Sequence, residues 1–193
     1  LDRPTRLIAR GDTPHQSTIL IEGFMLRTLD GDGSRHSVSF HVPGDFVDLH
    51  GFVLAGLEHS VVAVGPAEVE FVDHAHIEEL TNNHPHLTRL LWMTTAIDGA
   101  IHRQWLVAAN ALRSSAHLAH LICELYTRLA AVGVAKNHRM TLPLLQRELA
   151  CILGYSPIHI NRAVRDLRDR KLVRWSGTEI EVLDWPGLVR LAR

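Results

Sequence analysis

The spacing of hydrophobic residues changes twice along the chain. Between residues 5 and 73, short segments alternate between apolar and polar positions, a pattern typical of half-buried strands. From residue 73 onward, apolar residues recur every three or four positions, as on one face of a packed helix. Two strand-like segments return near residues 172–183. The pattern predicts an N-terminal β region, a helical middle and a C-terminal module containing a hairpin, and therefore an α+β fold.

Turn-forming sequences separate the segments of the N-terminal region. The predicted strands are Thr18–Ile21, Phe24–Leu29, His36–His41, Ser60–Val64 and Val69–Val72. The turns are Arg10-Gly11-Asp12, Asp30-Gly31-Asp32-Gly33, Pro43-Gly44-Asp45 and Gly65-Pro66. Many short strands joined by regular turns favour a small antiparallel β barrel or jelly roll.

A helical pattern over Asp73–Asn83 leads into a long helix, predicted over residues 86–111 after Asn83-His84-Pro85. Its apolar positions include Leu87, Leu90, Leu91, Ile97, Ile101, Trp105, Ala108 and Leu112. At about 1.5 Å per residue such a helix spans roughly 35–40 Å, more than a small domain needs. We expect the surplus apolar face to pack on a second copy of the same helix; packing within one domain is the alternative.

The next helix is predicted over residues 116–132, with Ser114-Ser115 as its cap and Gly133 at its end. Residues 134–141 are expected to form a loop. Segments 172–175 and 179–183 read as strands on either side of Ser176-Gly177-Thr178, which predicts a β wing. Asp184 is expected to cap a last short helix with Pro186 near its start.

Residues 146–168 contain two short helical patterns joined by a tight turn. Gly154 is suited to the positive φ of a helix end, Ser156 to an N-cap, and Pro157 to the first helical position. The inward positions are Leu149, Ile152 and Leu153 in the first helix and Ile160, Ala163, Val164 and Leu167 in the second. The opposite face of the second helix carries Ile158, Asn161, Arg162, Arg165 and Arg168. Together these features predict a helix-turn-helix with a recognition helix.

The charge distribution supports the same interpretation. The net charge of the 193 residues is −1, but residues 1–138 hold 10 Lys+Arg against 15 Asp+Glu, a net of −5. Residues 139–193 hold 10 Lys+Arg against 6 Asp+Glu, a net of +4. An acidic body with a basic C-terminal module predicts that only the C-terminal part meets a polyanion.

Other features limit the class of protein. No signal peptide opens the chain and no apolar segment approaches the ~20 residues of a membrane helix, so we expect a cytoplasmic protein with no membrane partner. The chain starts at Leu1 without Met, so we expect a missing N-terminal segment. Cys123 and Cys151 lie in apolar helical patterns and are expected to be buried, reduced thiols.

The sequence predicts no enzyme, no catalytic residue and no metal site. It contains no nucleophile–base–acid set, phosphate-binding loop or HExxH motif, and the adjacent Glu78 and Glu79 face different ways on a helix. Among the 14 histidines, the pairs His74/His76 and His84/His86 are interpreted as surface residues. No cofactor is identified.

Several motifs resemble those of the Crp/Fnr bacterial transcription regulators. In the N-terminal half these are Ile8-Ala9-Arg10-Gly11-Asp12, Ile21-Glu22-Gly23 and Pro43-Gly44-Asp45-Phe46; in the C-terminal half they are Arg147-Glu148-Leu149-Ala150 and the segment from Leu153 to Arg162. The resemblance implies an effector-type β-barrel domain like that of cyclic-nucleotide binders at residues 1–84, a long dimerisation helix at 85–112, and a winged helix-turn-helix DNA-binding domain at 113–193.

The chain departs from the pattern of cyclic-nucleotide binders in this family. Leu49 falls where the ribose-binding Glu would stand, and His59-Ser60 replaces the Arg-Ser pair that holds the cyclic phosphate. A neutral imidazole cannot supply the bidentate fork of Arg, so cyclic AMP is not the expected effector. The implied pocket residues are Asp48, Leu49, His50, His59 and Ser60. For His50 and His59 an anion, a haem, a pH-sensitive pocket and no ligand stay open, and the effector is unknown.

Leu145 stands where many relatives have a Thr that caps the first helix of the motif and touches phosphate. Leucine can do neither, so we expect either an earlier start at Thr141 and Pro143 or a frayed end. For the recognition helix the resemblance implies that Arg162 reads a guanine. Ser156 and His159 are candidates for phosphate, and Ile158 for a thymine methyl.

The remaining DNA-facing residues in this interpretation are Pro157, Asn161, Arg165 and Arg168. Arg165, Arg168 and Lys171 are either phosphate contacts or a solvated cationic face. The expected partners are double-stranded DNA, read as an inverted repeat, and a second copy bound through residues 86–111; RNA polymerase is a further candidate. The alternative is a ligand-sensing or interaction protein with the same barrel that does not itself bind DNA.

Overall fold

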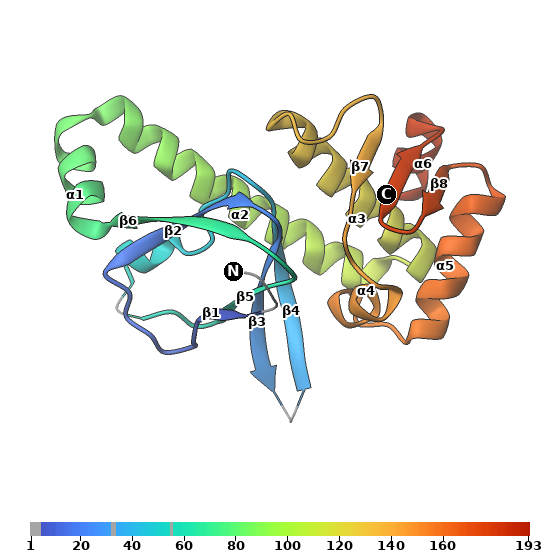
Figure 1. Ribbon diagram of the computed structural model, residues 1–193, viewed down its shortest axis with the longest axis horizontal. Helices are drawn as coiled ribbons and strands as arrows, with labels where there is room; N and C mark the ends of the chain where they lie inside the picture. Colours follow the sequence, from blue (N-terminus) through green and yellow to red (C-terminus); the bar gives the residue numbers. More distant parts are fainter. Residues whose placement is uncertain (1–4, 32–33, 55) are drawn as a thin grey trace. The chain divides into compact units, whose positions relative to one another are not determined.

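The computed structural model (Figure 1) describes residues 5–31, 34–54 and 56–193. The chain divides into two compact units, Leu1–Trp105 and Leu106–Arg193. The boundary falls inside the long helix α2, Pro85–Ala111, so this helix contributes residues to both units.

The first unit holds two antiparallel sheets. Its strands are β1 Arg6–Ile8, β2 Gln16–Glu22, β3 Met25–Gly31, β4 Ser34–His41, β5 Ser60–Ala63 and β6 Glu68–Asp73. One sheet has the order β1-β5-β3-β4, and the other pairs β2 with β6. The five predicted strands and the α+β class are thereby confirmed. The predicted turn at Asp30–Gly33 lies partly outside the described residues. Gly31 at the end of β3 pairs with Ser34 at the start of β4, as a hairpin requires.

Backbone geometry explains one glycine of the N-terminal motifs. Gly23 joins β2 to β3 with φ of 88°, a region that favours glycine. A Cβ at this position would lie 2.4 Å from the carbonyl oxygen of Pro66. The close approach of the two backbones therefore requires a residue without a side chain.

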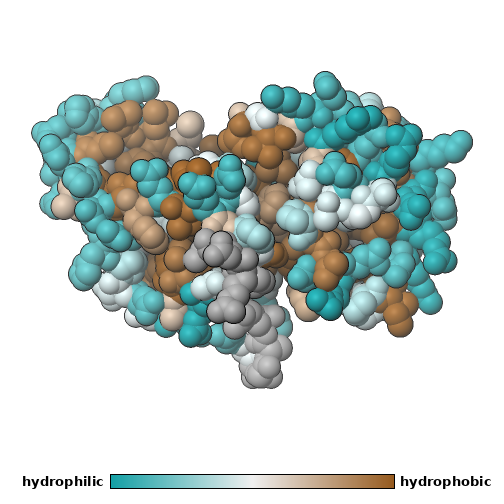
Figure 2. Space-filling view, in the orientation of Figure 1, coloured by the Kyte–Doolittle hydropathy of each residue, from teal (hydrophilic) through white to brown (hydrophobic). Residues whose placement is uncertain are grey.

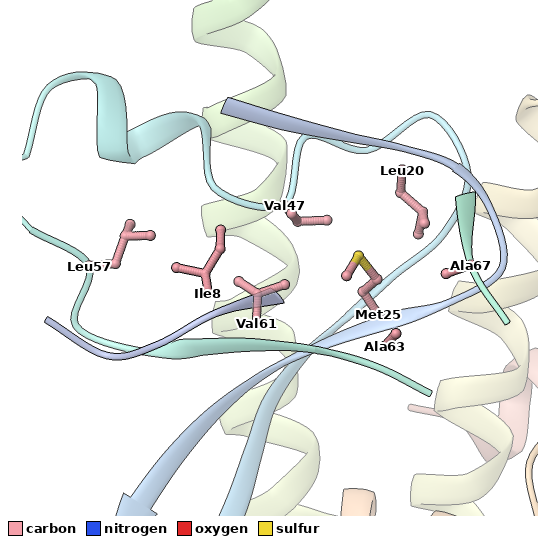
Figure 3. Close-up of a cluster of buried hydrophobic side chains, with 8 residues drawn as sticks. All are labelled: Ile8, Leu20, Met25, Val47, Leu57, Val61, Ala63 and Ala67. Atoms are coloured by element: carbon pink, nitrogen blue, oxygen red, sulfur yellow. The ribbon is translucent and has the colours of Figure 1, made fainter. Parts of the chain in front are cut away.

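A buried hydrophobic cluster fills the space between the two sheets (Figure 3). It consists of Ile8, Leu20, Met25, Val47, Leu57, Val61, Ala63 and Ala67. Burial of one large apolar side chain contributes about 1.5–3 kcal/mol, so the cluster is a main source of stability for this unit. Val47 and Leu57 also anchor both ends of the segment that carries η1, the short 3-10 helix Leu49–Phe52. The core thus fixes the position of the predicted effector pocket.

Two helices follow the sheets: α1 His74–Asn83 and the 27-residue α2. Helix α2 exposes an unusual number of large apolar side chains, namely Leu87, Leu90, Trp92, Met93, Ile97, Leu106 and Val107. Figure 2 shows hydrophobic residues at the surface over the first half of this helix. Among the described residues, no helix combines the length and apolar character needed to cross a bilayer.

The second unit contains the helices and sheet of the C-terminal module. Its elements are α3 Ser114–Ala131, β7 Arg139–Thr141, α4 Gln146–Leu153, α5 Pro157–Asp169, β8 Val173–Ser176, β9 Glu179–Val182 and α6 Trp185–Leu191. The strands form one antiparallel sheet of order β7-β9-β8. The predicted wing is confirmed as β8 and β9. Asp184 caps α6 as expected, because its Oδ1 accepts a hydrogen bond from the Gly187 N–H at 2.9 Å.

Two local predictions for this unit are wrong. Residues 134–141 are not all loop, because β7 pairs with β9 through Met140 and Ile180. Ser114-Ser115 does not cap α3; Ser114 is already helical, and the N-cap is Arg113, without a side-chain hydrogen bond. Gly133 does follow the end of α3 with φ of 78°, as predicted.

The prediction of buried cysteines is also wrong. Cys151 is exposed and Cys123 is half-buried, and both are free thiols. In the eight-residue α4 the apolar face is made by Leu149, Ile152 and Leu153 with Ala150, so Cys151 falls on the other side. Burial raises the pKa of the Cys123 thiol to about 11, which keeps it protonated and unreactive.

Candidate nucleic-acid interface

The turn between α4 and α5 has the geometry that its sequence predicts. Gly154 is left-handed, with φ of 72° and ψ of 27°, and ends α4. Ser156 is the N-cap of α5, its Oγ accepting from the His159 N–H at 3.4 Å, and Pro157 occupies the first turn. The His159 Nδ1 also lies 2.8 Å from the Ser156 Oγ. These contacts fix the direction in which α5 leaves the turn.

Helix α4 begins at Gln146, so the expected earlier start at Thr141 and Pro143 is wrong. Its N-cap is Leu145, whose side chain has no polar atom to accept a hydrogen bond. Glu148 compensates in part, since its Oε2 accepts from the Leu145 N–H at 2.7 Å. This is the carboxylate half of a capping box, and it places a negative charge in the first turn, where the helix dipole favours it.

Helix α5 is sharply divided into a buried and an exposed face. Its buried residues are Ile160, Ala163, Val164 and Leu167, as the spacing predicts. All eight residues predicted to face DNA are exposed: Ser156, Pro157, Ile158, His159, Asn161, Arg162, Arg165 and Arg168. Helices α3 and α4 pack on the buried face. The polar face is therefore held rigidly outward.

Three arginines on this exposed face are free of carboxylates. In the part of the chain that the structure describes, neither Arg162, Arg165 nor Arg168 forms an ion pair. Arg170 at the end of the helix differs, because its Nε lies 2.8 Å from Asp166 Oδ1. The three free guanidinium groups make a positive surface whose charge is not internally cancelled.

An open depression of ≈ 360 Å³ lies beside these arginines, between α4 and α5. It is lined by Gln146, Asn161, Val164, Arg165, Arg168 and Asp169. Two of its side chains are cationic, one is anionic and two are amides. Figure 2 shows that the surface over α5 is predominantly hydrophilic. The groups present are the donors that bind phosphate oxygens and base edges.

The β wing has a different electrostatic character. Arg139 of β7 and Arg174 of β8 both form ion pairs with the single carboxylate of Glu181 on β9. Hydrogen bonding from Arg139 holds the pKa of Glu181 below its usual range. The Trp175 Nε1–H donates to the Gly177 carbonyl at 3.1 Å and closes the wing turn. The wing is ordered but close to charge-balanced.

Two residues that were not predicted from the sequence, Tyr155 and His117, stabilise the turn between α4 and α5. The Tyr155 hydroxyl donates to the Leu112 carbonyl at 3.3 Å and lies 3.3 Å from Nδ1 of the buried His117 on α3. Burial lowers the pKa of His117 and raises that of Tyr155. His117 gave no separate signal in the sequence, because its spacing is that of an ordinary core position of α3.

The predicted effector-pocket residues are only partly brought together. His50 and His59 lie close together, with ring centroids 5.0 Å apart. Asp48 is fully buried and accepts hydrogen bonds from Thr18, at 2.5 Å from the backbone N–H and 3.0 Å from the hydroxyl. The Ser60 Oγ accepts from the Arg10 N–H at 3.1 Å, and Leu49 is buried. Asp48 and Ser60 thus bind neighbouring chain segments, while the two histidines face each other.

Comparison with known proteins agrees with the fold and with this geometry. Residues 116–191 match the model of the Crp-like helix-turn-helix domain, which covers α3 through α6. Over its whole length the chain is similar to Crp/Fnr transcriptional regulators. Residues 116–191 therefore form a helix-turn-helix domain of the Crp-like class.

Similar Crp/Fnr proteins span both halves of the chain. The transcriptional regulatory protein btr of Bordetella pertussis is 26% identical over 84% of this chain, and the match covers 66% of that protein, just under two thirds. The transcriptional activator protein FnrA of Stutzerimonas stutzeri is 24% identical over 100% of this chain and 79% of its own length. FixK2 from Bradyrhizobium japonicum shares the fold, with a TM-score of 0.83 at 18% identity, covering 100% of this chain and 94% of that one.

Two further charged residues lie at the predicted effector pocket and were not singled out from the sequence. Arg27 of β3 is buried; its Nη1 donates to Asp98 Oδ2 of α2 at 2.5 Å and its Nε to the Val47 carbonyl at 2.7 Å. Glu58 lies 3.1 Å from His59, measured from Oε1 to Nδ1. The proximity of Glu58 and His59 in the sequence was the available signal, whereas nothing local revealed the burial of Arg27.

Proposed function

We propose that this Crp/Fnr regulator binds double-stranded DNA as a homodimer, with one α5 helix in the major groove of each half of an inverted repeat. The observation that carries the proposal is the exposed face of α5, on which Arg162, Arg165 and Arg168 have no carboxylate partner among the residues that the structure describes. Phosphates would satisfy such cations, and a groove about 12 Å wide admits a helix.

Each exposed position of α5 has a role in this proposal. Arg162 reads a guanine through O6 and N7, because only a guanidinium offers two parallel donors to that edge. Ser156, Pro157 and His159, at the helix start, approach a phosphate where the helix dipole is positive. Asn161, Arg165 and Arg168 contact phosphates or neighbouring base edges, and the wing sheet lies beside them in the same unit. Ile158 packs on a thymine methyl.

The exposed apolar residues of α2 support the dimer. A soluble monomer rarely exposes a continuous apolar surface of this kind, and a second copy of the same helix would cover it. Trp92, at 74% exposed, is the most open of these side chains. A two-fold axis through paired α2 helices would relate two α5 helices and so requires an operator with inverted symmetry.

In this proposal the parts of the chain divide the work. Residues 1–84 form the effector-type domain, residues 85–112 the dimerisation helix and residues 113–193 the DNA-binding domain. An effector at Asp48, Leu49, His50, His59 and Ser60 would act by binding two states of the dimer with different affinity. The regulator acts in the cytoplasm, with RNA polymerase as a further partner at the promoter.

Selection of bound sequences from a random DNA pool, followed by mobility-shift titration in increasing salt, tests the proposal. We expect an inverted repeat and an affinity that falls steeply with salt, as counterion release requires. A pool that stays unenriched would instead favour the ligand-sensing alternative without DNA binding.

Arg162→Ala gives the sharpest variant for this test. It should weaken binding to the selected operator by about 1–3 kcal/mol and relax the preference at one guanine. Arg170→Ala is the matched control, because Arg170 is already neutralised by Asp166 and should change binding far less. Equal effects of the two substitutions would contradict base reading by Arg162.

A further inference from the structure

Three side chains at the predicted effector pocket are arranged like ligands around a small ion. His50, Glu58 and His59 each offer one ligand atom, and these atoms all lie within 4.8 Å of one another. They come from η1 and from the residues just before β5. The Glu58 carboxylate reaches both rings, with Oε1 3.1 Å from His59 Nδ1 and Oε2 3.9 Å from His50 Nε2.

The two rings hold buried polar atoms that the protein itself does not satisfy. His59 is 2% exposed. Within the described residues, neither its Nε2 nor the buried Nε2 of His50 has a hydrogen-bond partner. Buried polar atoms are normally paired, so two such nitrogens in neighbouring rings call for a ligand.

The groups of the cluster suit a cation, because it offers two imidazoles and one carboxylate. Burial lowers the pKa of His50 to about 4 and also lowers the pKa of His59. The Glu58 carboxylate is the charged group of the cluster. The nearby Arg27 guanidinium is held by Asp98 and the Val47 carbonyl. Its positive charge also lowers the pKa of both imidazoles. A cyclic phosphate would find no free cation among these three residues.

We propose that His50, Glu58 and His59 form a binding site for a divalent transition-metal ion of the Zn²⁺ or Fe²⁺ class. Two imidazole nitrogens and one carboxylate oxygen are a common three-ligand set for such ions. Mg²⁺ and Ca²⁺ do not fit, because they prefer oxygen ligands throughout. Glu58 is 66% exposed on its side chain, so the site opens to solvent and keeps room for a further ligand. The sequence alone had given no metal site.

Metal binding would join η1 to the start of β5 across the intervening loop. This placement makes the ion a candidate effector in the position where cyclic-nucleotide binders of the family hold phosphate. Only that regulatory role rests on the proposed function. The site itself belongs to the free protein and is measured without DNA.

The test uses the full chain after treatment with EDTA and dialysis. Titration with Co²⁺, read by its visible absorption, and with Zn²⁺, read by calorimetry, should each show one equivalent per chain, while Mg²⁺ should show no binding. Glu58→Gln and His50→Gln should each weaken Zn²⁺ binding and raise its dissociation constant by about tenfold or more. His76→Gln is the control, because His76 is exposed and lies outside the cluster.

Equal affinity of the wild type, Glu58→Gln and His50→Gln would mean an adventitious ion only and would overturn the proposal. Zn²⁺ should also raise the melting temperature of the wild type and the control but not of Glu58→Gln, since binding to the native state alone stabilises it. Glu58 is exposed, so its replacement by the isosteric Gln keeps the fold, which circular dichroism checks. A chain that binds Zn²⁺ normally and no DNA would refute the proposed function and leave the metal site intact.

Discussion

Ile158 is an apolar side chain on the otherwise polar face of α5, and it is 64% exposed. An isoleucine cannot accept a hydrogen bond from cytosine, but its methyl groups can pack against the C5-methyl of thymine. We therefore predict half-sites that favour A·T opposite Ile158. Sequencing of the selected pool measures this preference. Ile158→Glu should shift it toward C·G, and a cytosine requirement in the wild type would contradict the prediction.

A second prediction at the scale of one residue concerns His41 of β4. Burial lowers its pKa from 6.5 to about 4, against the opposing effect of Asp45, whose Oδ2 lies 3.3 Å from Nδ1. The charges of Arg27 and Asp98 also act on the ring, in opposite directions. In the unfolded chain His41 regains its ordinary pKa near 6.5.

The sign follows from the proton that only the unfolded chain binds. As the pH falls from about 6.5 to about 4, His41 becomes protonated in the unfolded state but stays neutral in the folded state. The free energy of unfolding therefore decreases across this window. The loss approaches about 3 kcal/mol at its lower end. Urea unfolding of the wild type and of His41→Gln at pH 7.5, 6, 5 and 4 measures it. The variant should lose less stability on acidification than the wild type. If the free energies of unfolding of both proteins fell in parallel with pH, His41 would not be the group responsible.

The faces of α5 were predictable residue by residue, whereas the pocket was not. Inside one helix the spacing of apolar positions determines which side chains are buried, so the exposure of Arg162 follows from Ile160, Ala163 and Val164. The pocket draws on Arg27, Glu58 and Asp98, which lie far apart in the sequence. Their proximity depends on sheet pairing and on α2, and no local pattern encodes it.

At the scale of elements, the turn before α5 is where a small change should act most clearly. Gly154 has φ of 72°, and a Cβ placed there would meet no atom within 4 Å. Gly154→Ala therefore should lose about 1–2 kcal/mol through backbone strain alone. Gly99→Ala is the control: Gly99 lies inside α2, where Ala is the better helix former by about 0.5–1 kcal/mol.

Chemical denaturation of the two variants beside the wild type measures both changes. The expected order of stability is Gly99→Ala at or above the wild type and Gly154→Ala below it. Should Gly154→Ala match the wild type in stability, the left-handed helix end would not be required for the fold.

Strand length decided which elements could be predicted. The strands β1 and β7 have three residues each, so each offers only one fully buried apolar position, Ile8 and Met140. A single position cannot display an alternation, and both strands depend on partners elsewhere, β5 and β9. The longer strands and the α-helices carry more than one period of their pattern and were predictable from it, whereas the four-residue η1 was not predicted.

At the scale of the whole molecule, the proposed dimer depends on the apolar surface of α2. Ile97→Glu would place a charge among side chains that a partner helix covers, and desolvating that charge is costly. We predict a monomer by sedimentation analysis at micromolar concentration, together with a loss of operator affinity of at least tenfold. Val134→Glu, which changes an exposed apolar residue after α3, should stay dimeric and bind DNA normally.

The charge-balanced wing has a consequence for how the regulator would search a genome. Because Glu181 holds both Arg139 and Arg174, the strands β8 and β9 add little general attraction to the sugar–phosphate backbone, and the pull toward DNA is concentrated on α5. We therefore expect such a protein to dwell only briefly on random sequence. Its residence at a promoter is then governed by the fit between one helix and a few base pairs.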